Sequence, residues 1–271
     1  MPPAITLNLI REAELMKNLF IERIPVPQVL EYDPTYQNPL RHPYMIMERL
    51  EGINLLEAVE NLNRTKINNV LRDIAKTLHR IHRVDTTNLK VRKFTVLRSF
   101  IDSGISGIKR LATLSNTKNF EDFESWIQKN RPNEATYNMA FIHNDFHPFN
   151  IMVSNESLSG ILDWNDAVVG EAQVDVAMFN LLTEAAGYPE LAKTFATAYQ
   201  NISNLSLEEI NFYITAIAIQ KFLQIPLQEK ELKETGQLEK AEFLGSLRSR
   251  LEKNLIRIIE ENTNLSLCGF Q

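Results

Sequence analysis

Apolar and polar residues follow two different rhythms along the chain, and the change separates the first fifty residues from the rest. Residues 7–20 place apolar side chains at helical spacing. The next stretch, IPVPQVL, contains two prolines, which end a helix and favour extended chain. QVLEYDP and YMIMERL are short β-branched or aromatic segments bounded by Pro and Gly, so each predicts a strand. Gly52 then marks a turn.

From residue 53 onward the pattern is mainly helical. Residues 67–84 predict a strongly amphipathic helix, because six apolar residues share one stripe: Ile67, Val70, Leu71, Ile74, Leu78 and Ile81. Further helical patterns cover residues 96–114 and 120–129, and helical spacing returns from residue 174 to about 262. Between them, NIMV and GILDW, joined by the polar SNESLS, predict a small β-hairpin.

These elements predict an α+β architecture with two parts. Residues 1–52 form a smaller part containing one helix, two strands and a connecting segment. Residues 53–271 form a mostly helical part that contains the hairpin, with the boundary near residues 50–55. No internal repeat or low-complexity tract interrupts this order.

Composition narrows the classes of protein that fit. With 271 residues, of which 44% are apolar, the chain can bury a sizeable core. The formal net charge of −5 and the lack of a basic cluster argue against a nucleic-acid partner. No apolar run reaches the ~18 residues that a membrane span needs. The N-terminal residues lack the pattern of a signal peptide, so we expect a cytoplasmic protein without membrane contact.

Cysteine chemistry is also limited. Cys268 is the only cysteine, so no internal disulfide can form. Its place near the C-terminus argues against a catalytic thiol.

The most informative stretch is FIHNDFHPFNIMVSNESLSGILDWNDA, residues 141–167. Asp145 and Asn150 are five residues apart on a loop, and Asp163 follows thirteen residues later at the end of the second predicted strand. A hairpin would bring Asn150 and Asp163 side by side beneath Asp145. A carboxylate and an amide oxygen suit Mg²⁺ when phosphate oxygens complete its coordination, and a second carboxylate can accept a hydroxyl proton. The spacing therefore predicts a phosphoryl-transfer site.

The same stretch resembles a known family. HNDFHPFN matches the H-x-D-x-x-x-x-N loop of kinases, and with the following LDWNDAVVGEAQVDVAMF it is most similar to the aminoglycoside phosphotransferase and choline kinase-like family. The resemblance extends upstream to REAELMKNLFIERIPVPQVL, YMIMERLEG and IAKTLHRIHRVD, in the family's order. It implies a protein-kinase-like two-lobe fold, ATP and Mg²⁺ as cofactors, and a small-molecule hydroxyl as substrate.

The resemblance also implies a role for each matching residue. Asp145 would be the catalytic base or would orient the hydroxyl. Asn150 and Asp163 would hold Mg²⁺ against the ATP phosphates. The backbone from Glu48 to Leu50 would face the adenine edge.

Three further residues would support this site. His143 would stabilise the loop, Asp175 would accept backbone N–H groups of the loop, and Glu12 matches the helix glutamate that pairs with the phosphate-binding lysine. Asn144 replaces the family's usual Gly, and Asn tolerates the left-handed backbone that the position needs.

Simpler interpretations stay open for several of these positions. Asp145 and Asn150 are common turn formers. His147 and Asp145 could form a transition-metal pair, although no second His or Cys is near in sequence. Asp166 could be a turn residue, a helix cap or a secondary metal contact. Trp164 and Trp126 are expected to pack in the core.

One expected part of the family pattern is missing. Only eleven residues precede Glu12, and they contain neither Gly nor Lys, so they cannot supply the glycine-rich hairpin and the lysine strand that hold the phosphates. The expectation is a truncated N-terminal lobe, from a start codon placed too far downstream, a gene fragment or a natural reduction. Glu12 would then need another basic partner such as Arg11, and the remaining strands would expose an edge.

Two functions follow. The first is an ATP- and Mg²⁺-dependent phosphotransferase acting on a small-molecule hydroxyl, with activity lowered by the missing segment. The alternative is a degenerate, non-catalytic kinase-fold module that binds a small molecule. The sequence identifies neither the substrate nor the oligomeric state. The family resemblance alone does not imply antibiotic resistance.

Overall fold

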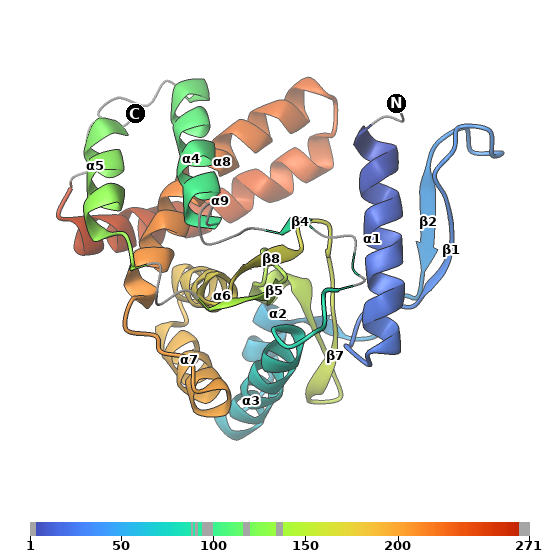
Figure 1. Cartoon of the computed structure of the whole chain (residues 1–271), viewed down its shortest axis with the longest axis horizontal. Helices are drawn as coiled ribbons and strands as arrows, with labels where there is room; N and C mark the ends of the chain where they lie inside the picture. The colour runs from blue at the N-terminus through green and yellow to red at the C-terminus, as the bar shows by residue number, and fades with distance from the viewer. Residues whose placement is uncertain are drawn as a thin grey trace.

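The structure, a computed structural model, describes residues 4–87, 89, 92–93, 100–115, 120–133 and 138–265. Within these ranges it is an α+β protein with three small sheets, of which the β1–β2 ribbon lies at the edge of the molecule beside α1 (Figure 1). The helices are α1 (Ala4–Ile21), α2 (Leu55–Asn61), α3 (Arg64–Ile81), α4 (Phe100–Leu114), α5 (Phe120–Asn130), α6 (Gln173–Ala185), α7 (Pro189–Ser203), α8 (Ile210–Glu234) and α9 (Leu238–Thr263). The strands are β1 (Val29–Asp33), β2 (Tyr44–Met47), β3 (Ile53–Asn54), β4 (Arg92–Lys93), β5 (Met139–Ile142), β6 (Ile151–Ser154), β7 (Ser157–Ile161) and β8 (Val168–Glu171).

The N-terminal elements agree with the prediction. Helix α1 contains the predicted segment 7–20, and β1 and β2 form an antiparallel ribbon that packs on α1. Tyr32 joins ribbon and helix by donating to Glu14 Oε1 at 2.7 Å, and Lys17 Nζ lies 4.5 Å from the centre of its ring. Leu30 and Ile46 are exposed on this ribbon.

The predicted hairpin is confirmed as β6 and β7, which pair antiparallel. The structure adds β3, which pairs with β6, so the hairpin belongs to a three-stranded sheet. A second such sheet, with the order β4-β8-β5, was not predicted. Strands of two to four residues are too short to show the alternation on which sequence prediction depends.

Two glycines fix how the N-terminal segment meets this hairpin. Gly52 has a φ of +106°, and a Cβ there would lie 2.1 Å from the backbone oxygen of Val153, so only glycine fits. Gly160 in β7 lies directly beneath Leu50, whose Cδ1 would be 2.3 Å from an added Cβ. The segment at residues 50–52 therefore packs against the backbone of both hairpin strands.

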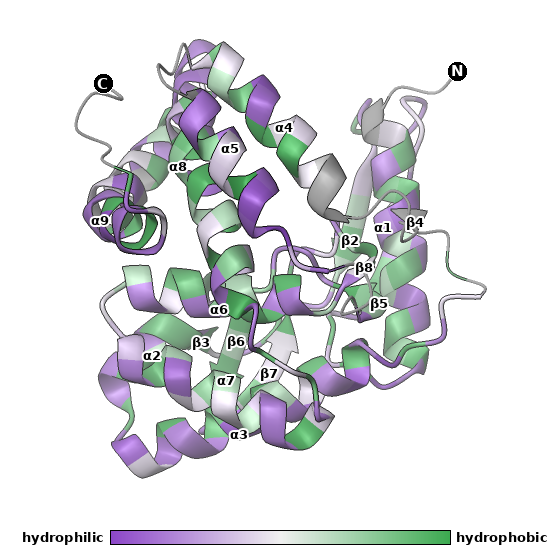
Figure 2. Ribbon diagram, turned by 60° about the vertical axis from the view of Figure 1, so that its left-hand side comes forward, coloured by the Kyte–Doolittle hydropathy of each residue, from purple (hydrophilic) through white to green (hydrophobic). Residues whose placement is uncertain are grey.

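The core lies mainly among the C-terminal helices. Helix α3 begins at its cap Asn63, whose side chain accepts from Lys66 N at 3.0 Å, and its predicted stripe is buried. Helix α6 is buried on nearly all sides, which explains its mostly apolar sequence. Figure 2 shows that the helices around it carry both polar and apolar surfaces.

The remaining helix predictions are confirmed where they can be compared. Helices α4 and α5 cover the patterns at 96–114 and 120–129, except that residues 96–99 lie outside the described ranges, as does Cys268. In the described part of the chain, no helix is both long and apolar enough to cross a membrane.

Candidate functional site

The polar loop, residues 143–150, connects β5 to β6 and is anchored by a buried carboxylate. Strand β5 leads into the loop and pairs with β8, and β8 leads into α6, which carries Asp175 in its first turn. Asp175 is fully buried and accepts the backbone N–H groups of His143 and Asn144, each at 2.8 Å. Asn144 has a φ of +66°, the left-handed conformation expected where the family has Gly.

Asp175 is itself connected to two more side chains. His82 Nε2 lies 3.0 Å from Asp175 Oδ2, and His82 Nδ1 lies 2.6 Å from the hydroxyl of Tyr199. A carboxylate can only accept, so His82 donates through Nε2 and Tyr199 donates to Nδ1. Burial, together with the charge of Asp175, raises the pKa of Tyr199, which keeps this hydroxyl a donor. His82 and Tyr199 carry no motif that would have identified them from the sequence alone.

His143 has a structural environment. Its ring is fully buried, its Nε2 donates to Leu162 O at 2.9 Å, and its Nδ1 accepts the backbone N–H of Asp145 at 3.3 Å. The ring lies 4.6 Å from Trp164, which is also buried as expected. Burial lowers the pKa of His143, so the neutral ring is the stable form.

Asp145 projects from the polar loop and receives three side-chain donors. Lys221 Nζ lies 3.1 Å from Oδ1, while His147 Nε2 and Asn150 Nδ2 lie 3.2 Å and 3.3 Å from Oδ2. Burial acts to raise the pKa of Asp145, but the hydrogen bond from His147 and the charge of Lys221 outweigh it and hold that pKa well below its usual range. Asp145 is therefore ionised at neutral pH.

Asn150 and Asp163 lie at the same end of the β6–β7 hairpin. Ile151 pairs with Ile161, and the next residue, Leu162, donates its N–H to Asn150 O at 2.8 Å. Asp163 follows directly, with a φ of +62° and an exposed side chain. Asn150 Nδ2 also donates to Asp145 O at 3.1 Å. The structure thus brings Asp145, Asn150 and Asp163 to one place.

Helix α1 contacts the segment just after Asp163. Arg11 donates to the backbone oxygen of Asn165. Burial and the charge of Asp163 raise the pKa of Glu12, and a backbone hydrogen bond from Trp164 partly opposes this rise. In the described part of the chain, Glu12 forms no ion pair, and Arg11 is the nearby cation that lowers its pKa.

The predicted adenine-facing segment runs out of β2. Glu48 N donates to Gln28 O at 2.8 Å, and Gln28 N donates to the Glu48 carboxylate at 3.3 Å. The backbone N–H of Glu48 is therefore already hydrogen-bonded to the segment that leads into β1. Leu50 packs over Gly160.

We call the end of the β6–β7 hairpin that carries Asn150 and Asp163 the hairpin mouth. Several carboxylates lie near it. Partial desolvation raises the pKa of Asp166, and the charges of Asp145 and Asp163 raise it further. Glu12 experiences the charge of Asp163 in the same way. The negative charge that raises the pKa values of Asp166 and Glu12 is of the kind that a hard cation with oxygen ligands would neutralise.

Asn150 and Asp163 would offer oxygen donors to a metal ion. The described residues contain no group of three or more His, Cys, Asp or Glu side chains arranged around a common point. An incomplete protein donor set is normal for Mg²⁺, which keeps water and substrate phosphates as ligands. His147 contacts Asp145 directly, so the geometry gives no support to the alternative of a transition-metal pair.

A polar cavity of about 210 Å³ opens beside Asp145. Asn144, Asp145 and Asp166 border it on one side, and α4, α6 and α8 form the other sides. Lys221 lines it from α8. No sequence signal could have identified Lys221, because it lies 76 residues from Asp145 on a long helix without a recognisable motif.

Comparison with known proteins identifies the fold and the family. Residues 3–210 match the family described as "Phosphotransferase enzyme family" (APH). Because this match spans most of the chain, the protein belongs to the phosphotransferase enzyme family. A comparison with curated protein sequences gives no significant match.

Solved structures show the same fold at low sequence identity. The chain is similar to a protein from Ralstonia eutropha JMP134 described as an aminoglycoside phosphotransferase, with a TM-score of 0.73 and 15% identity over 94% of this chain and 83% of that one. It also resembles APH(3'')-Id from Streptomyces rimosus ATCC10970, solved with ADP and streptomycin, with a TM-score of 0.60 and 13% identity over 81% and 85% of the two chains. APH(2'')-IIa, solved with streptomycin and ATP, gives a TM-score of 0.59 and 19% identity over 82% and 76%. The predicted kinase-like α+β fold is thereby confirmed.

Proposed function

We propose that this protein transfers the γ-phosphoryl group of ATP to a hydroxyl group of a small molecule. The family is one of phosphotransferases. The observation that supports the proposal most directly is the position of the ionised Asp145 carboxylate between the polar cavity and the hairpin mouth. An acceptor in the cavity and phosphates at the hairpin mouth would meet at this carboxylate.

In the transfer step, Asp145 accepts a hydrogen bond from the acceptor hydroxyl and takes its proton as the oxygen attacks. A bond forms between the acceptor oxygen and the γ-phosphorus, and the bond from that phosphorus to the β–γ bridging oxygen breaks, so that ADP leaves. The hydrogen bond from His147 and the charge of Lys221 leave Asp145 ionised but lower its basicity, so this carboxylate orients the hydroxyl and receives the proton as the hydroxyl becomes more acidic on bonding to phosphorus. Most of the rate enhancement then comes from alignment and charge stabilisation.

The hairpin mouth provides the nucleotide side of the site. Asn150 and Asp163 would hold Mg²⁺, which when bound neutralises charge on the phosphates. Glu12 and Arg11 hold the segment after Asp163, while His143 and Asp175 fix the polar loop.

The adenine edge would face the backbone from Glu48 to Leu50, which connects the two parts of the molecule. Glu48 N is already committed to Gln28, so the Glu48 carbonyl and the Leu50 N–H are the groups that we assign to the base.

A paired measurement tests the proposal. Melting temperatures with and without Mg²⁺-ATP report nucleotide binding, and ADP release with a panel of hydroxylated acceptors reports transfer. Asp145→Asn should keep the Mg²⁺-ATP shift and lower transfer by about 10²–10⁴-fold, because it removes the proton acceptor. Asp163→Asn should instead weaken the Mg²⁺-dependent shift. Unchanged transfer in Asp145→Asn would refute the assignment.

One observation favours the alternative of a non-catalytic binding module. The hydrogen bond from His147 and the charge of Lys221 hold the pKa of Asp145 well below its usual range, which makes this carboxylate a weak proton acceptor. A module of this kind would bind a small molecule in the polar cavity yet give no product in a single-turnover experiment with excess protein. Product formation under those conditions would rule this function out.

A further inference from the structure

The polar cavity is widened by two glycines on α4. Gly104 and Gly107 lie one helical turn apart and both line the cavity. An added Cβ at either position would meet no atom within 4 Å. Glycine destabilises a helix interior relative to alanine, and here no close packing requires it. The room that the missing side chains leave is therefore room for an occupant of the cavity.

The α8 side of the cavity is polar but not acidic. Gln220, Lys221 and Gln224 line it, and Gln224 Oε1 is buried without a hydrogen-bond partner among the described residues. A buried acceptor of this kind is costly unless a ligand or a water molecule donates to it. Amide side chains both donate and accept, which suits hydroxyl groups.

The charges around the cavity do not suit a polycation. Lys221 pairs with Asp145 at 3.1 Å, which leaves Asp166 as the single carboxylate without a basic partner among the described lining residues. Several ammonium groups would need several carboxylates to replace their hydration. Lys221 neutralises Asp145 and so removes the carboxylate that a cationic acceptor would otherwise pair with.

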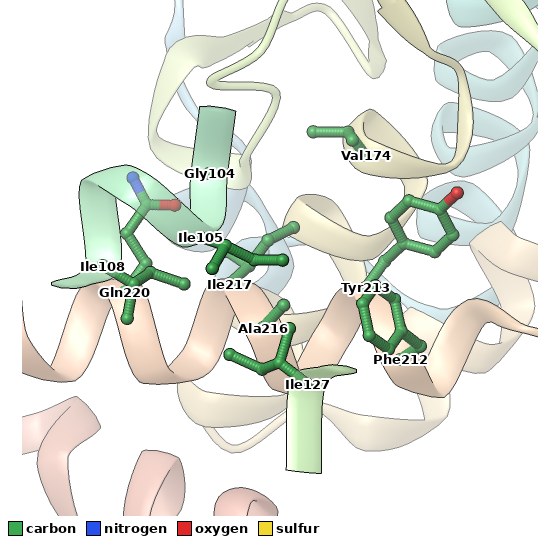
Figure 3. Close-up of a pocket in the computed structure, with 10 residues that line it drawn as sticks. All are labelled: Gly104, Ile105, Ile108, Ile127, Val174, Phe212, Tyr213, Ala216, Ile217 and Gln220. Carbon is green, nitrogen blue, oxygen red and sulfur yellow. The ribbon is translucent and has the colours of Figure 1, made fainter. Parts of the chain in front are cut away.

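An apolar cavity of about 30 Å³ adjoins the polar one and shares Gly104, Val174, Ile217 and Gln220 with it. Figure 3 shows Ile105, Ile127 and Ile217 directed into the space between α4, α5 and α8. A cavity of this size has room for a small apolar group, such as a methyl or ethyl group.

We propose that the acceptor is a small, uncharged, hydroxyl-bearing molecule with a short apolar end, and that Gly104, Gly107 and Lys221 determine this selectivity. The inference rests on the proposed function for the position of the reacting hydroxyl at Asp145. The glycines provide space, the α8 amides bind hydroxyl groups, and Lys221 disfavours cationic acceptors.

Acceptor binding without nucleotide tests this selectivity directly. The probes are monosaccharide-sized hydroxylated compounds in neutral, cationic and anionic sets, screened by saturation-transfer NMR against the full chain. Neutral compounds with a methyl or ethyl group should bind, and Gly107→Leu should abolish their binding by filling the cavity. Arg110→Leu, which places the same side chain on an exposed position of α4, should leave it unchanged.

Two further variants separate selectivity from folding. Gly104→Ala should raise the melting temperature by about 2–4 °C while weakening acceptor binding, a combination that a purely structural glycine would not give. Lys221→Gln should allow cationic probes to bind.

Three results would overturn the inference. The unaltered protein could bind cationic probes as tightly as neutral ones, or Gly107→Leu could bind every probe as well as the unaltered protein does. The third is that Lys221→Gln binds cationic probes no better than the unaltered protein. Failure of the proposed function would appear separately, as absence of Mg²⁺-ATP binding or of transfer while these acceptor contacts persist.

Discussion

In the polar loop the backbone N–H groups of His143 and Asn144 share one buried carboxylate. The α4 and α8 wall of the polar cavity instead contains two glycines and an amide oxygen that has no partner among the described residues. The two regions face each other across Asp145 and Lys221. The loop is held in one geometry by its hydrogen bonds, as transfer chemistry requires. The wall instead leaves the oxygen of Gln224 available to a ligand or a water molecule.

The largest effect should come from removing the anchor of the loop. Asp175→Ala leaves the backbone donors of His143 and Asn144, together with His82, without their acceptor in a buried site. We expect the free energy of unfolding to fall by about 3–5 kcal/mol, measured by urea denaturation. Asp73→Ala, which removes an exposed i,i+3 ion pair with Lys76, is the matched control and should change it by less than about 0.5 kcal/mol. Equal effects in the two variants would contradict the contrast.

A smaller effect, visible through pH, should come from His143. Burial lowers the pKa of His143 in the folded protein, so the unfolded chain binds the proton first as the pH falls. The stability contribution of the neutral ring is complete above the unfolded pKa of ~6.5 and is lost below it, by up to about 1.4 kcal/mol per pH unit.

The measurement compares urea denaturation between pH 7.5 and 5 for the unaltered protein and for His143→Gln. The variant should show a shallower loss of stability in this window. His42→Gln, at an exposed position, should reproduce the original slope. If His143→Gln leaves the slope unchanged, His143 is not buried in its neutral form.

The smallest change in the free energy of unfolding should come from the α4 and α8 wall of the polar cavity, and it should be an increase. Gln224→Met removes a buried oxygen that has no partner in the described part of the chain and keeps a similar side-chain volume, so the free energy of unfolding should rise by about 1 kcal/mol. Thermal denaturation measures this change. A loss of stability would show that the wall is as fully satisfied as the loop.

The sequence predicted the parts of the molecule that depend on local pattern. The amphipathic stripe of α3 and the hairpin β6–β7 follow from spacing over ten or more residues. The loop motif was sufficient to predict which residues gather at the hairpin mouth, because a hairpin fixes the positions of its own ends.

Contacts between distant segments could not be predicted in this way. Strands β3, β4, β5 and β8 are defined by their partners rather than by their own short sequences. Lys221 contacts Asp145, which lies 76 residues away in the sequence, and His82 contacts Asp175, which lies 93 residues away. Only the tertiary packing of the helices brings these side chains together.

Arg11 and Glu12, neighbours on α1, both bind backbone immediately beyond Asp163. A rotation of α1 about its axis cannot move one contact without disturbing the other, so the helix and the turn behave as one mechanical unit. A partner that bound the outer surface of α1 and moved this helix would therefore also move Asp163, without contacting it.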